Sequence, residues 1–114
     1  MIDAAAIGEI IALYKKHGWT LRRVLLSAPL GKSLLTGDAD IFGDTDVRAS
    51  ELDAAWFSRS STPERTAWEI RHLSGTPYAL VEVIENGTDA QFSDKVLEGA
   101  EARMKETILK RRAN

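Results

Sequence analysis

Apolar and polar positions between residues 51 and 85 follow a pattern that predicts three strands separated by two turns. The apolar runs are Leu52 to Arg59, Arg65 to Leu73 and Thr76 to Glu85. The first turn is the segment 60–64, which contains a proline, and the second is Ser74-Gly75. This stretch therefore predicts an antiparallel meander.

The second turn suggests how the last two of these strands pair. A two-residue loop at Ser74-Gly75 suits a primed turn, because glycine adopts a positive φ without a steric cost. It pairs Trp68 with Val81, and alternate side chains then point to opposite faces. The face expected in the core holds Trp68, Ile70, Ala79, Val81 and Val83, and the other holds Glu69, Arg71, Tyr78, Leu80, Glu82 and Ile84. A three-residue loop would place Glu82 opposite Trp68 on the apolar face, so the two-residue loop is preferred.

Helical periodicity flanks the meander on both sides. Residues 3–17 predict a helix capped by Asp3 and ended by Gly18. Residues 19–26 predict a strand, residues 27–36 a short helix, and residues 38–50 a loop rich in aspartate and glycine. Residues 88–112 predict a long helix that begins at a capping box, since Thr88 is followed three residues later by a glutamine. Its apolar stripe is Phe92, Val96, Ala100, Met104 and Ile108, with Leu97 beside it.

The predicted order is helix, strand, short helix, three strands and helix. It favours an α+β fold of two layers, with the N- and C-terminal helices packed on one face of a four-stranded, mainly antiparallel sheet. The chain has 114 residues, enough for one domain with its own core. We therefore expect residues 1–114 to form a single α+β domain.

Composition narrows the classes of function. A net charge of −2 disfavours a dedicated nucleic-acid binder, which usually carries a basic excess. The absence of cysteine excludes disulfides, thiol nucleophiles and thiolate metal sites. No run approaches the roughly 20 apolar residues of a membrane span, and the first residues lack the basic region of a signal peptide. We expect a cytoplasmic protein.

Two segments resemble ligand-binding loops without matching them. Gly31-Lys32-Ser33 follows an apolar strand, but Leu26 stands where a phosphate-binding loop needs its first glycine. The acidic segment Asp38 to Asp46 has two aspartates and a glycine at calcium-loop positions, but Phe42 replaces an oxygen ligand. We predict no cofactor and no metal site, and both segments are interpreted as solvated structure.

No residues indicate a catalytic site. His17 and His72 have no third metal ligand at helical or strand spacing. No serine lies in a nucleophile motif, and a site needs a nucleophile, a base and an orienting group together. An enzyme of unknown class is therefore the third alternative for function.

The second face of the meander supplies the leading hypothesis. Apolar side chains surrounded by charged ones are typical of protein interfaces. The predicted interface residues are Glu69, Arg71, Tyr78, Leu80, Glu82 and Ile84. We therefore expect a non-enzymatic protein–protein interaction domain that self-associates, or binds another protein, through this face. The alternative is a small-ligand or nucleic-acid-binding module that uses the same face.

Overall fold

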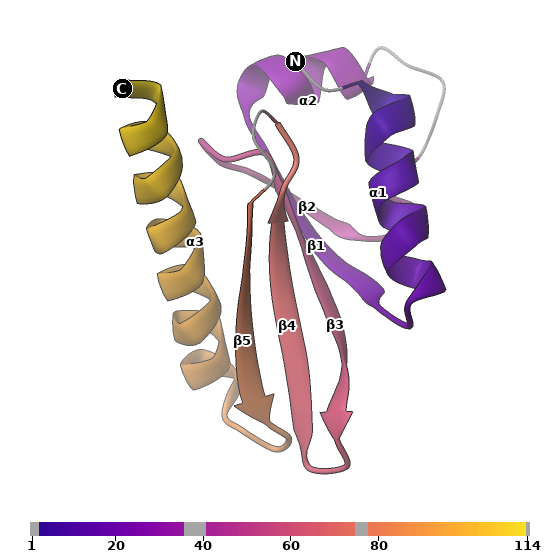
Figure 1. Cartoon of the computed structure of the whole chain (residues 1–114), viewed down its shortest axis with the longest axis vertical. Helices are drawn as coiled ribbons and strands as arrows, with labels where there is room; N and C mark the ends of the chain where they lie inside the picture. The colour runs from indigo at the N-terminus through magenta and orange to yellow at the C-terminus, as the bar shows by residue number, and fades with distance from the viewer. Residues whose placement is uncertain (1–2, 36–40, 75–77, 114) are drawn as a thin grey trace.

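A computed structural model describes residues 3–35, 41–74 and 78–113 (Figure 1). In chain order the elements are α1 (Ala4–Lys16), β1 (Thr20–Leu26), α2 (Ala28–Leu35), β2 (Asp46–Ala49), β3 (Ala54–Thr62), β4 (Arg65–His72), β5 (Ala79–Glu85) and α3 (Ala90–Ala113). The strands form one sheet in the order β2-β1-β3-β4-β5. The β1–β2 pair is parallel, and the other three pairs are antiparallel. The predicted α+β class with a mainly antiparallel sheet is confirmed.

The sheet has a fifth strand that the sequence analysis placed in a loop. β2 has four residues and pairs with the end of β1, so that Val24 lies beside Val47. Parallel neighbours need a crossover connection, and α2 lies in the connection between β1 and β2. All four β2 residues are exposed, which explains why their local pattern did not predict a strand.

The predicted register of β4 and β5 is wrong by one residue. Trp68 pairs with Glu82 instead of Val81, and Ile70 pairs with Leu80. This is the pairing that the three-residue loop would give, although residues 75–77 lie outside the described part of the chain. The shift moves every β5 side chain to the face opposite the predicted one.

The terminal helices lie on opposite faces of the sheet, not on one face as predicted (Figure 1). Neighbouring residues of β3 show this directly. Ala54 and Trp56 pack with α3, whereas Ala55 and Phe57 pack with α1 and α2. A strand covered on both sides has a continuous apolar run, and all four of these side chains are buried.

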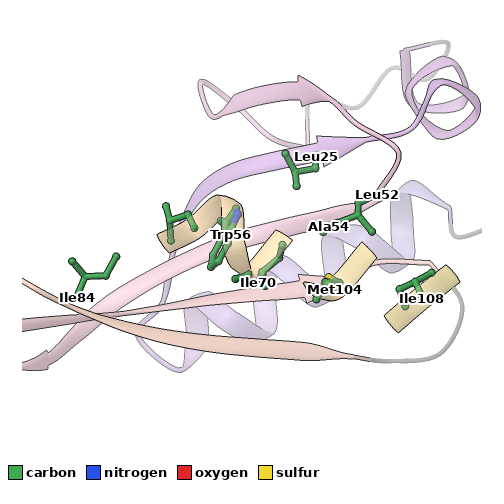
Figure 2. Packing of buried hydrophobic residues seen from close by; sticks show 10 residues of the cluster. Leu25, Leu52, Ala54, Trp56, Ile70, Ile84, Met104 and Ile108 are labelled. Atoms are coloured by element: carbon green, nitrogen blue, oxygen red, sulfur yellow. The ribbon is translucent and has the colours of Figure 1, made fainter. Parts of the chain in front are cut away.

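The α3-side core is the cluster between α3 and the sheet (Figure 2). Its buried members are Leu25, Leu52, Ala54, Trp56, Ile70, Ile84, Leu97, Ala100, Met104 and Ile108. Trp56 donates its Nε1 hydrogen to Glu101 Oε2 at 2.8 Å. Arg23 Nη1 lies 3.5 Å from the same oxygen, so one carboxylate of α3 holds both the indole and a guanidinium of the sheet.

The α1/α2-side core occupies the other face. Its buried members are Ile7, Ile11, Val24, Leu26, Leu30, Ala55, Phe57 and Leu73. The expected Asp3 cap is confirmed, because its carboxylate accepts a hydrogen bond from Ala6 N at 2.8 Å. These helices pack mainly over β1 and β3, which places the core at the middle of the sheet.

The start of α3 differs from the prediction. Asp89 Oδ1 accepts from Gln91 N at 2.8 Å, so Asp89 caps the helix. The Thr88 hydroxyl instead donates to Glu85 O at 2.5 Å. Phe92, expected in the apolar stripe, is 61% exposed, because the helix meets the sheet only from its second turn onward.

Candidate interaction surface

The sheet face that carries α1 becomes more exposed from β3 to β5. Phe57 pairs with Glu69, and Glu69 pairs with Val81, so these side chains form one row across three strands. Phe57 is fully buried, Glu69 is half-buried and Val81 is 53% exposed. We call the uncovered part the open face; it consists of Glu69, Arg71, Ala79, Val81 and Val83.

A groove of about 450 Å³ separates the end of α1 from β4 and borders the open face. Its lining residues are Leu13, Tyr14, His17, Trp19, Arg59, Glu69 and Arg71. Leu13 is 56% exposed on α1 and supplies an apolar wall opposite the strands. The surface therefore combines apolar side chains at both sides with a charged centre.

Tyr14 fixes the boundary between the buried and open parts of this face. Its ring stacks on Phe57 with a centroid distance of 4.0 Å, and its hydroxyl donates to Glu69. Burial, with the hydrogen bond to Glu69 as a second cause, raises the pKa of Tyr14 well above the usual value of a tyrosine. Glu69 is thereby held in place and points into the groove.

Two arginines complete the charged centre. The Arg59 guanidinium lies 5.1 Å from the Trp19 ring centroid and donates to His17 O at 2.9 Å, so it is held against the end of α1. Arg71 donates to the backbone oxygen of His72. Among the described residues, neither Glu69 nor Arg71 forms an ion pair with another side chain.

Four of the six predicted interface residues lie on the α3 side instead. Ile84 is buried in the α3-side core, and Tyr78 and Leu80 pack partly buried against it. Glu82 forms an ion pair with Arg103 of α3. The prediction that Tyr78, Leu80 and Ile84 form the apolar centre of an exposed face is therefore wrong. The cause is the register shift, which turns these side chains toward α3.

Glu69 and Arg71 are the two predicted interface residues that lie on the open face. The apolar partners that the structure brings beside them are Val81 and Val83, which the sequence analysis expected in the core. No local feature identified Leu13 as their neighbour, because α1 and β4 are far apart in the sequence.

The remaining sequence candidates form neither a phosphate-binding loop nor a metal cluster within the described residues. Gly31-Lys32-Ser33 lies inside α2, where Gly31 N donates to Ser27 O at 2.8 Å and is not free to bind phosphate. Asp38 and Asp40 lie outside the described residues, so the interpretation of the segment Asp38 to Asp46 as solvated structure without a metal site is not tested there. No three metal-ligating side chains gather within the described ranges.

Among the described helices, none is long and apolar enough to cross a membrane. No known family model, curated protein or solved structure matches this chain.

Proposed function

We propose that this chain is a protein–protein interaction domain that self-associates through the open face and the groove beside it. The observation that carries the proposal is the exposure of two neighbouring valines on a sheet face: Val81 is 53% and Val83 is 51% exposed. When a second surface covers apolar side chains on an open sheet face and removes them from water, the free energy of the assembled state is lowered.

The charges favour a second copy as the partner. Glu69 and Arg71 lie two residues apart on β4 and point to the same face. Consider a twofold axis that lies between two copies, perpendicular to the strands, and passes midway between Glu69 and Arg71. It would place Glu69 of one chain opposite Arg71 of the other, and this contact would occur twice per interface. Neither residue forms an ion pair within the described residues, so no side-chain ion pair competes with such a contact.

The first test is the mass of the protein in solution, measured by light scattering over a range of concentrations. The wild-type chain is expected to have the mass of a dimer. Val83→Arg should raise the dissociation constant at least about a hundredfold, because it would bury an unpaired charge. Leu109→Arg is the matched control, since Leu109 is 52% exposed on α3; it should leave the mass unchanged. A monomeric wild-type chain would overturn the proposal.

A charge-exchange experiment tests the proposed twofold contact. Glu69→Lys and Arg71→Glu should each weaken the dimer, because like charges then face each other. An equimolar mixture of the two variants should form a heterodimer, since opposite charges meet again at both contacts. If the mixture stays as monomers while Val83→Arg also dissociates the wild type, the open face is used with another alignment.

The alternative occupant of the same face is a small ligand or a single-stranded nucleic acid. Binding of bases needs aromatic rings that are free to stack. Here the Tyr14 ring stacks on Phe57 and one face of Trp19 is covered by Arg59. These internal contacts favour a second protein chain over a stacked ligand.

A further inference from the structure

A second opening lies at the opposite edge of the same sheet face, between α2 and β2. Val47 of β2 pairs with Val24 of the α1/α2-side core, so it faces the same side as α2. The cavity has a volume of about 600 Å³, within the roughly 300–1,000 Å³ of small-molecule pockets. It lies at the carboxyl ends of β1 and β2, where sheets with parallel crossovers often bind ligands.

The walls of this cavity are mostly apolar. They are formed by Leu26 from β1, Leu34 from α2, Ile41 and Phe42 from the following segment, and Val47 from β2. Leu26 is buried, whereas Leu34, Ile41 and Phe42 are partly buried around the core. A ligand with an aliphatic or aromatic body would therefore cover side chains that α2 leaves partly in water.

The polar groups of the cavity are few and mainly positive. Lys32 is exposed and forms no ion pair with any described residue. Arg48 also lines the cavity, but Asp46 Oδ2 lies 2.8 Å from its Nε and compensates its charge. Ser50 Oγ accepts from Leu52 N at 3.1 Å, so its hydroxyl hydrogen remains available to a ligand.

A buried carboxylate holds one wall in place. Asp53 accepts hydrogen bonds from Ser27 N at 2.7 Å and Ser27 Oγ at 3.1 Å. Its backbone oxygen accepts from Leu73 N at 2.8 Å. These bonds join the end of β1 and the start of α2 to the middle of the sheet. The apolar wall is thus formed before any ligand binds.

We propose that this cavity binds an amphipathic carboxylate, with its apolar chain among Leu26, Leu34 and Phe42 and its carboxylate at Lys32. Among the described residues that line the cavity, Lys32 is the cation without an ion pair, and one such cation at an apolar cavity complements one negative charge. A phosphate would require several donors, and the Gly31 amide of α2 is already bonded to Ser27 O. This site lies at the edge opposite the open face, so it is independent of the proposed self-association.

Isothermal titration calorimetry with sodium decanoate, below its micelle-forming concentration, tests the proposal. We expect one binding site per chain. Lys32→Met should raise the dissociation constant about tenfold, because it removes one hydrogen bond between charged groups. Lys95→Met is the matched control on α3, where Lys95 is exposed, and it should bind as the wild type does. No binding up to about 1 mM, or equal weakening by both variants, would overturn the proposal.

A second variant locates the apolar chain. Val47 is 46% exposed, so Val47→Trp should fill the cavity while the fold, followed by circular dichroism, is retained. Decanoate binding should then be lost, whereas the mass in solution should not change. A Val47→Trp variant that binds decanoate like the wild type would place the ligand elsewhere and overturn the proposal. Val83→Arg should leave decanoate binding intact, which separates this site from the open face.

Discussion

The two faces of the sheet are covered by helices in different ways. On one face a single helix of 24 residues, α3, packs along β5 and β4 and closes a core that reaches β1. On the other face α1 and α2, with 13 and 8 residues, cover mainly the middle strands. The first face is covered by one helix from β5 to β1, and the second is open at both edges.

This difference shows that the exposure of a strand residue depends on which helix reaches it. Ile84 and Val83 are neighbours on β5 and have similar side chains. Ile84 points to α3 and is 8% exposed, whereas Val83 points to the other face and is 51% exposed. The same edge strand thus contributes to the core with one face and to the candidate interface with the other.

The largest expected effect separates these two neighbours directly. Ile84→Ala should lower the free energy of unfolding by about 2–4 kcal/mol, because it leaves a cavity in the α3-side core. Val83→Ala should change it by no more than about 0.5 kcal/mol. Urea unfolding at a concentration where the chain is monomeric gives both values. Equal losses would mean that the two faces of β5 are equally covered.

A smaller effect tests how α3 seals its face. Glu101→Ala should cost about 1–3 kcal/mol, because Trp56 Nε1 would be left buried without an acceptor. The matched control is Glu98→Ala, one turn earlier on the same helix, where the side chain is exposed. Thermal unfolding should distinguish the two variants. If both are as stable as the wild type, apolar packing alone holds α3 on the sheet.

The smallest effect concerns Tyr14, at the boundary of the open face. Its raised pKa means that the folded state favours the neutral phenol. This contribution to stability is complete below the pKa of an unfolded tyrosine, about 10, and is lost as the pH rises through the higher folded value.

Ultraviolet titration should therefore show that Tyr14 ionises at a higher pH in the folded chain than in the unfolded chain. Tyr14→Phe should remove this component and cost about 1 kcal/mol at neutral pH. A wild-type titration that lacks this component would contradict the burial of Tyr14 and its hydrogen bond to Glu69.

The sequence predicted the helices, the meander and the strand order within it, since these depend on local periodicity and turn residues. It did not predict the register of β5, which was chosen to keep Glu82 off the apolar face. The structure places Glu82 there because Arg103 of α3 forms an ion pair with it. Arg103 is far from β5 in the sequence, so the local pattern does not reveal this ion pair. Separating polar from apolar side chains therefore selected the wrong pairing of β4 with β5.

The placement of the helices on two faces did have a local signal. Residues 54–57 are apolar without interruption, as expected for a strand buried on both sides. β2 gave a weaker signal, because its four residues include Asp46 and Arg48. The candidate interface was half predicted: Glu69 and Arg71 were named, but Val81 and Val83 were assigned to the core.

The position of β1 between β2 and β3 has a consequence for the order in which the chain folds. β3, β4 and β5 are joined by short connections and form hairpins from local contacts, which assemble quickly. β1 is made early during synthesis, but β3, the strand that joins it to the meander, emerges later. β2 in turn needs β1 in place. We therefore expect β2 to join last and to open first, so its amide hydrogens should exchange with solvent sooner than those of β4.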